Sequence, residues 1–400
     1  MKLYIQMGYG KGDKVDKAFH DKSIGGIILS PRDEKKESLE ASVINMQSLH
    51  KNLDILFDPQ LYYTTYAEAV CKNLNSYSYF PGIISLSYFK FRNINKVIVD
   101  CLEYQEDLSL NTLVAPNIII NNFSSRDAQI ALNFADESAQ VGKELGKEVY
   151  ASLLFNESAL NETSNLNTFL NELSVLDVKG FYITVVRNQS QYDQNFESSL
   201  QIKNLLSMMY SLREINHYDI VMGYTDVLGA LFMPFDIKGI STGWHNSSKK
   251  FTVKQKILPS SGGRLPRERY TSNSLLNSVY LSELDSIAEQ FGTNSREFQT
   301  LLSKTPYDNL LQISSTPSAN WNRSLSHLQH WAAINNLIKE FNQQPNISKK
   351  FDLLEVKISN AEKFYDYLKH KSIQFEMATS KRHLKNWAEG ISEFRREYNV

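Results

Sequence analysis

The sequence predicts a (β/α)8 barrel over residues 1–245, followed by a helical extension, and three observations lead to this fold class. Eight short runs rich in β-branched or aromatic residues alternate with segments long enough for amphipathic helices, which is typical of parallel α/β folds. Apolar centres such as Ile118–Ile120 suit strands that are covered on both faces. Because no run reads as an edge strand, closure into a barrel is favoured over an open sheet.

The predicted strands follow one another along the chain, and helix signals separate them. Ser124–Asp127 predicts the start of a helix that stops near Gly146. The stretch between Asp58 and Leu113 is longer than one crossover helix needs, so we expect an insertion after the third strand, with a helix at 93–106. The eight strand runs are Leu3–Met7, Gly26–Ser30, Asp54–Asp58, Leu113–Asn121, Val149–Asn156, Gly180–Val186, Asp219–Gly223 and Lys238–Thr242.

After residue 245 the composition changes. Residues 246–271 are rich in Lys, Arg, Gly and Pro, which predicts a flexible basic linker. Residues 272–400 predict the helical extension, and its amphipathic last helix uses Trp387 either to dock on the body or to bind a protein partner. The expected helices cover 272–291, 295–303, 324–342, 359–371 and 380–397.

The charge is unevenly distributed although the net charge is −1. Residues 246–400 hold 22 Lys and Arg against 15 Asp and Glu, which leaves 21 basic against 29 acidic residues in 1–245. A basic tail favours a polyanionic partner such as a nucleotide or nucleic acid, although a solvated helical surface explains it too. No apolar run reaches the roughly 20 residues of a membrane span, and no secretory signal is recognisable, so we expect a cytoplasmic protein without a membrane partner.

Metal and cofactor signatures are weak. Cys71 and Cys101 form neither a disulfide framework nor a zinc motif. The pair His327 and His330 has no acidic or sulfur partner at a metal-binding spacing. The glycines of 8–12 match neither the Walker spacing nor the dinucleotide fingerprint. We therefore expect no metal and no cofactor.

Candidate catalytic residues come from the ends of the predicted strands, because barrel active sites lie at the C-terminal strand ends. Asp58 follows Leu56 and Phe57, a context that would desolvate its carboxyl group and raise its pKa toward the range of a general acid or base. Alternatively it caps a helix or pairs with Arg32. Glu157 could complete a carboxylate pair for glycosidic-bond chemistry or lie in a surface turn, and Asp226 could assist or cap a helix.

Candidate binding residues share the same strand ends. Arg32 and Arg187 stand in apolar contexts, so each should meet an anion, either of a ligand or of an internal carboxylate. Trp244 and His245 offer a stacking surface and a titratable group, or else cover the core. Three arginines of the basic segment could reach a phosphate over the mouth or pair with barrel acids. These are Arg264, Arg267 and Arg269, and the remaining candidates are Gln6, Gln60, Asn122 and Tyr224.

One stretch resembles a known family. Val221-Met222-Gly223-Tyr224, followed by a short helix and an apolar return strand, is similar to the seventh and eighth strand units of tRNA-guanine transglycosylase-like barrels. In that family a nucleophilic carboxylate follows the last strand, and a cysteine and histidine zinc site follows the barrel. Here Ser241–Trp244 occupy that strand end and no zinc motif is present. The resemblance implies a nucleobase or nucleic-acid ligand but not the transglycosylase activity.

Two functional hypotheses follow. The first is an enzyme, such as a glycosidic-bond hydrolase or transferase, that binds a nucleotide, nucleic acid or glycoside in the barrel mouth and uses Asp58 as acid or base. The second is a non-catalytic scaffold of a multi-protein bacterial system, with the extension mediating assembly. Side chains of Asp58, Arg32 and Arg187 that converge on an open pocket would support the enzyme, whereas closed salt bridges filling the mouth would support the scaffold.

Overall fold

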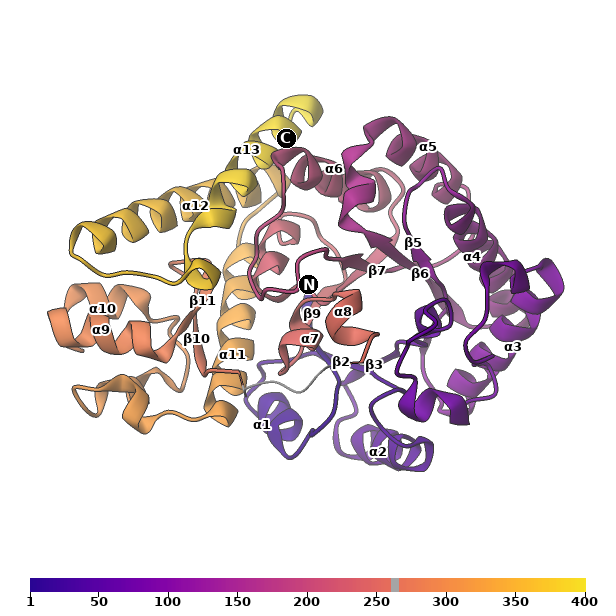
Figure 1. The fold of residues 1–400 in the computed structure, drawn as a ribbon, viewed down its shortest axis with the longest axis horizontal. Helices are drawn as coiled ribbons and strands as arrows, with labels where there is room; N and C mark the ends of the chain where they lie inside the picture. Colours follow the sequence, from indigo (N-terminus) through magenta and orange to yellow (C-terminus); the bar gives the residue numbers. More distant parts are fainter. Residues whose placement is uncertain (260–265) are drawn as a thin grey trace.

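The computed structural model describes residues 1–259 and 266–400 and confirms the predicted barrel. Parallel strands follow one another in the order β3-β2-β1-β9-β8-β7-β6-β4, and β3 and β4, at the two ends of this order, lie next to each other, so the barrel is nearly closed (Figure 1). The strands are β1 Lys2–Gln6, β2 Gly26–Leu29, β3 Asp54–Phe57, β4 Thr112–Val114, β5 Ile119–Ile120, β6 Glu148–Asn156, β7 Gly180–Val186, β8 Asp219–Gly223 and β9 Gly239–Thr242.

The fourth strand position is split into β4 and β5, both paired with β6, where the sequence predicts one continuous run. The register shifts by one residue between the Val114–Tyr150 and Ile119–Leu154 pairs. Pro116 lies within this bulge and has no N–H to donate to a ladder. Asn117 replaces the missing backbone contact, since its Nδ2 donates to the Ser152 carbonyl at 2.7 Å.

Helices cover the outside of the barrel, and the insertion after β3 lies beside them. Between β3 and the helix at 91–107 the chain forms short helical turns whose tyrosines are largely buried, including Tyr62, Tyr63 and Tyr79. The following helix thus begins two residues before the predicted start at 93. The barrel helices are α1 Lys14–His20, α2 Lys36–Leu49, α3 Phe91–Asp107, α4 Arg126–Leu145, α5 Thr163–Leu173 and α6 Ser199–Met209.

Side-chain alternation along the strands determines what fills the barrel. A layer of large side chains packs in the interior as a separate buried cluster. Because successive strand residues point to opposite faces, the residues two positions further on face the same interior, now at the C-terminal strand ends. This places polar side chains at the mouth, as expected. The packed layer consists of Tyr4, Ile28, Leu56, Val114, Tyr150, Tyr182 and Val221, and Gln6, Ser30, Asp58 and Thr184 follow four of them.

The segment predicted as a flexible linker differs from that prediction over its described part. Residues 246–259 contain two short helices, α7 Asn246–Lys249 and α8 Val253–Lys256, which lie over the barrel mouth (Figure 1). Lys249, Lys250 and Lys256 are all buried. Residues 266–271 run into the first strand of a hairpin. The composition predicts a flexible basic linker, but these lysine side chains are buried in the protein.

The extension contains a hairpin and helices. An antiparallel pair, β10 Arg269–Ser272 and β11 Asn277–Tyr280, stands where a helix from 272 is predicted. Its polar side chains bond locally and compete with helix formation, as when Asn277 Oδ1 accepts the Ser278 N–H at 2.9 Å. The helices are α9 Leu281–Phe291, α10 Arg296–Leu301, α11 Arg323–Asn342, α12 Ile347–His370 and α13 Arg382–Tyr398, so α12 begins earlier than the predicted 359.

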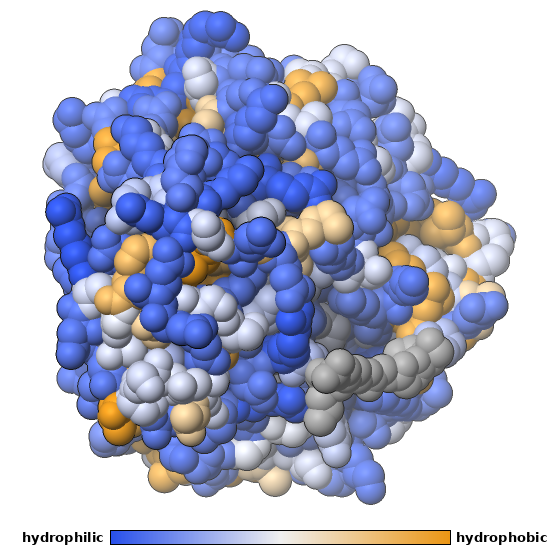
Figure 2. Space-filling model, turned by 60° about the vertical axis from the view of Figure 1, so that its left-hand side comes forward, coloured by the Kyte–Doolittle hydropathy of each residue, from blue (hydrophilic) through white to orange (hydrophobic). Residues whose placement is uncertain are grey.

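The extension packs directly on the barrel. Helix α13 lies beside α6 (Figure 1), and Trp387 is fully buried, so this helix docks on the body. Gly390 allows the close approach, because a Cβ there would lie 2.7 Å from the Ile202 Cβ. Figure 2 shows a mostly hydrophilic face with apolar side chains in small separate groups. Among the described residues, no helix is both long enough and apolar enough to cross a membrane.

Candidate functional site

Asp58 is the centre of a buried polar network at the C-terminal end of β3. Its Oδ2 accepts hydrogen bonds from the Tyr62 hydroxyl at 3.1 Å and the Tyr224 hydroxyl at 3.2 Å, and its Oδ1 accepts the Gln60 N–H at 3.2 Å. The side chain is 1% exposed. Burial raises the pKa of Asp58 to about 6, although Lys256 and these hydrogen bonds act in the opposite direction. Asp58 therefore titrates near neutral pH, as its sequence context predicts.

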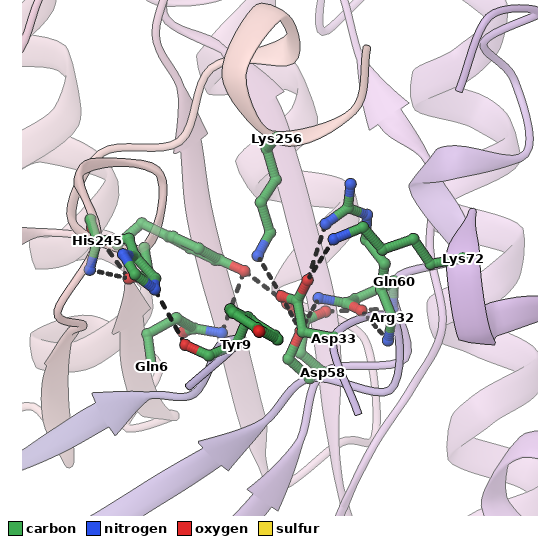
Figure 3. A network of polar contacts seen from close by, with 12 residues as sticks. Gln6, Tyr9, Arg32, Asp33, Asp58, Gln60, Lys72, His245 and Lys256 are labelled. Carbon is green, nitrogen blue, oxygen red and sulfur yellow. Dashed lines mark hydrogen bonds and ion pairs between the residues drawn. The ribbon is translucent and has the colours of Figure 1, made fainter. Parts of the chain in front are cut away.

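Gln6 extends this network across the barrel mouth (Figure 3). Its Nε2 donates to the Tyr224 hydroxyl at 3.1 Å, and its Oε1 accepts the hydroxyls of Tyr182 at 3.1 Å and Ser241 at 3.2 Å. The network thus joins side chains of β1, β7 and β9 to the residues after β3 and β8. Gln6, Asp58, Gln60 and Tyr224, all predicted as site residues, are brought together here.

Arg32 meets an internal anion, one of the two predicted alternatives. Its Nη1 lies 2.8 Å from Asp33 Oδ1, and Lys256 of α8 reaches Asp33 Oδ2 at 3.4 Å (Figure 3). Burial alone would raise the pKa of Asp33, but Lys256, Arg32 and the Ser30 hydroxyl lower it to about 2. Gln60 connects this ion cluster to the Asp58 network, since its Oε1 accepts the Arg32 N–H at 2.9 Å.

The mouth of the barrel is covered by α8 and by the insertion. The Tyr63 hydroxyl donates to the Lys256 carbonyl at 2.6 Å, and the Val70 N–H donates to the Ile257 carbonyl at 2.9 Å. A void of about 10 Å³, about one water molecule, lies next to Tyr224, Lys249 and Arg187. Because Asp58 is 1% exposed, a ligand can reach it only if the residues that cover it move.

Glu157 and Arg187 form a closed, buried ion pair. Arg187 Nε contacts Glu157 Oε2, and Glu157 Oε1 accepts the Asn188 N–H at 2.7 Å. The guanidinium also lies 3.7 Å above the Phe196 ring. Glu157 is therefore not in the surface turn that was one of its predicted alternatives. Both of its oxygens are engaged, which argues for a structural role.

Asp226 joins the barrel to the extension. Its Oδ2 accepts hydrogen bonds from Tyr192 and from Gln194 Nε2 at 2.9 Å, and its Oδ1 lies 3.0 Å from His330 Nε2 of α11. Burial opposes ionisation of Asp226, but His330 and Lys249 outweigh it, so its pKa is lowered. Its side chain does not cap the short helix Asp226–Phe232, because that helix has Thr225 as its N-cap residue.

Three residues of this region have left-handed backbone conformations. Gln60, Tyr224 and Asp226 have φ angles of +56°, +55° and +51°. Such conformations cost free energy for residues with a Cβ, most of all for a bulky tyrosine, and they cluster at functional sites. Here the turn at Tyr224 aims its phenol at Asp58.

The other predicted residues lie away from Asp58. Trp244 and His245 both bond the Tyr9 carbonyl, at 2.8 and 3.0 Å. Asn122, which follows β5 at the same barrel end, accepts the Ser124 N–H at 3.0 Å in a local turn. Arg267 pairs with Glu376 at 2.5 Å, the partly exposed Arg269 lies near Tyr192 and Tyr280, and Arg264 lies outside the described residues.

A pocket of about 120 Å³ lies between Trp244–His245 and the extension, lined by Lys249, Arg269 and His327 among others. Sequence reasoning missed Lys249 and Lys256, as well as Tyr62 and Tyr182. The alternation of Tyr182 with Thr184 in β7 could have placed that phenol inside the barrel, whereas nothing local marks the lysines as buried. Within residues 1–259 and 266–400, no group of three or more His, Cys, Asp or Glu side chains could hold a metal ion.

In comparisons with known proteins, no family model matches the chain and no curated protein is similar to it. Among solved structures, a chain described as a probable tagatose 6 phosphate kinase from Sinorhizobium meliloti 1021 aligns over 99% of this chain and 98% of its own length. The sequence identity is 9% and the TM-score 0.34. Similarity at this level carries no functional argument, and the resemblance to transglycosylase-like barrels stays a prediction.

Proposed function

We propose that this protein is a (β/α)8-barrel enzyme in which Asp58 acts as general acid or base on a ligand that enters the mouth beneath α8. The observation that carries the proposal is the position of Asp58: it is buried, has a pKa of about 6, and stands at the strand ends where barrel enzymes hold their catalytic groups. Of the three predicted catalytic carboxylates, Asp58 alone has no Lys, Arg or His within ion-pair distance in the described residues.

Two further observations support this role. The left-handed conformations of Gln60 and Tyr224 hold a backbone N–H and a phenol on the two oxygens of Asp58. Side chains fixed in this way are preorganised for proton transfer. The proposed substrate is a nucleotide or glycoside that is cleaved or exchanged at its glycosidic bond. This more specific part of the proposal is taken from the sequence.

The experiment compares the wild type with Asp58→Asn on defined probes, nucleoside 5′-monophosphates and p-nitrophenyl glycosides, by release of free base or nitrophenol. Asp54→Asn is the matched control, because Asp54 lies on the same strand but bonds Tyr4 at the opposite barrel end. We expect Asp58→Asn to lower turnover by about 100-fold or more and Asp54→Asn to retain it. Equal turnover by the two variants, or no turnover of any probe by the wild type, would overturn the proposal.

The closed ion pairs favour a second candidate, a non-catalytic scaffold. Arg32 with Asp33, and Arg187 with Glu157, fill the mouth rather than face an open pocket. Under this function, Asp58 stabilises the covered mouth and its replacement changes stability only. Unchanged assembly of the variant with the proteins that co-purify with the wild type, together with absent turnover in both, would support the scaffold.

A further inference from the structure

The pocket between the barrel mouth and the extension is lined by basic side chains from four elements, with Glu268 beside them at the rim. Lys249 comes from α7, Arg269 from β10, His327 and Arg323 from α11, and His245 from the turn after β9. We propose that this pocket binds a phosphate group. The binding stands independently of the proposed function, and only the assignment of this phosphate to the substrate rests on it.

Lys249 is the first argument for a bound anion. Its side chain is 7% exposed, and among the residues that the structure describes no carboxylate lies within ion-pair distance of its ammonium. The ammonium instead lies 5.8 Å from the centroid of the Tyr192 ring. Burial lowers the pKa of Lys249 to about 8, while the nearby Asp226 acts in the opposite direction and Arg269 adds to the lowering. Since an unpaired buried ammonium is costly, an anion in the pocket would supply the missing partner.

Arg269 is a second cation of the pocket, partly exposed, with no carboxylate within ion-pair distance in the described part of the chain. It lies between the rings of Tyr192 and Tyr280, 4.6 and 4.2 Å from their centroids. Its Nη atoms donate to the Ser278 carbonyl at 2.7 Å and to the Tyr280 hydroxyl at 2.8 Å. Its direct hydrogen-bond partners are neutral, whereas the carboxylates of Asp226 and Glu283 act on it from a greater distance. Burial lowers its pKa.

His327 is the third basic side chain of this pocket. Burial and the neighbouring Lys249 lower its pKa to about 2, so the imidazole is neutral. Its Nδ1 is buried and has no hydrogen-bond partner among the described residues. At the rim, Arg323 pairs with Glu268 at 3.6 Å in a partly exposed contact. The pocket therefore offers donors from several directions.

The arrangement of donors favours phosphate over a single carboxylate. Among the described residues no carboxylate lies within ion-pair distance of Lys249 or Arg269, although Asp226 acts on both and Glu283 acts on Arg269 from further away. Neither cation therefore has an anion in direct contact. A phosphate monoester carries a charge of about −1.5 to −2 and accepts hydrogen bonds from a tetrahedral set of directions. A carboxylate accepts in one plane and would leave part of the donor set unused.

Lys249 lies between the pocket and the candidate catalytic network. Lys249 lines both this pocket and the small void beside Tyr224, whose hydroxyl donates to Asp58. A phosphate held by Lys249 would therefore anchor a ligand whose remainder extends toward Asp58 once the residues that cover Asp58 move. This geometry points to a phosphorylated small molecule or a nucleotide as the substrate class.

Isothermal titration calorimetry at low salt tests the inference with inorganic phosphate, ribose 5-phosphate and adenosine 5′-monophosphate, and with adenosine and acetate as phosphate-free probes. We expect the phosphate-bearing probes alone to bind, and their ranking to separate free phosphate from a sugar phosphate and a nucleotide. Lys249→Gln should weaken binding at least tenfold. Lys254→Gln removes the same charge from an exposed position of the same segment and should change binding less than twofold.

Three results would overturn the inference: no binding of any phosphate probe to the wild type, equal weakening by Lys249→Gln and Lys254→Gln, or equal binding of acetate. If Lys249→Gln fails to fold, His327→Asn replaces it, with an expected weakening of threefold or more. Asp58→Asn should bind the phosphate probes like the wild type. Retained binding together with retained turnover in that variant would remove the Asp58 proposal and leave the phosphate site standing.

Discussion

The buried carboxyl group of Asp58 predicts a specific pH dependence of stability. Its pKa is about 6 in the folded protein and 3.8 in the reference state. The folded protein therefore holds the proton more tightly than the unfolded chain, and between these pKa values stability falls as the pH rises. A shift of about 2 units corresponds to about 3 kcal/mol. Asp58→Asn lacks this ionisation, so it should escape this loss.

The measurement is the free energy of unfolding by urea, followed by tryptophan fluorescence at pH values from 4 to 8 for both proteins. We expect the wild type to lose about 2 kcal/mol relative to Asp58→Asn between pH 4 and pH 7, with most of the loss falling between the two pKa values. Tyr62→Phe should move this transition to higher pH, because the Tyr62 hydrogen bond favours the ionised carboxylate. A difference between wild type and Asp58→Asn that is flat over this range, or of opposite sign, would refute the reasoning.

Three further predictions concern neighbouring contacts. Lys256→Met should raise the pKa of Asp58 further, because Lys256 favours its carboxylate. The loss of stability with rising pH, measured against Asp58→Asn, should then extend to higher pH, and an unchanged dependence of stability on pH would contradict this. Arg187→Met should lower the free energy of unfolding by about 3 to 5 kcal/mol by leaving Glu157 buried and unpaired, and adding Glu157→Gln should recover part of the loss. Gly223→Ala should lower the free energy of unfolding in urea by about 1 to 3 kcal/mol, since the new Cβ would lie 2.5 Å from the Thr184 Oγ1. Equal stability of the two proteins would show that Thr184 and the neighbouring Tyr182 can move to make room.

The barrel could be predicted because its signal is local. Each strand carries its own apolar run, and alternation alone places Asp58 two residues after the inward-facing Leu56. The same local context, apolar residues leading to a carboxylate, correctly indicates a raised pKa. The hairpin at 269–280 was missed because its serines and asparagines carry neither a strong strand pattern nor a helix breaker.

The cationic residues could not be assigned from local sequence. Lys249 and Lys256 stand in a lysine-rich stretch that is typical of a solvated surface. Their burial depends on Asp33 and Asp226. Asp33 is distant in the sequence, and Asp226 follows β8, not the strand that precedes the lysines. Likewise, the engagement of Glu157 by Arg187 depends on the spacing of two neighbouring strands, which sequence alone does not give.

The packing of α13 on α6 has a consequence for the order in which this protein can fold. Ile202 of α6 leaves the ribosome about 185 residues before Trp387, the side chain that α13 buries. At a synthesis rate of about 5–20 residues per second, the apolar side of α6 stays uncovered for roughly 10 to 40 s until α13 has been made. During synthesis this surface is a site for chaperone binding or for association between nascent chains, and a ribosome stalled before Trp387 would leave it uncovered.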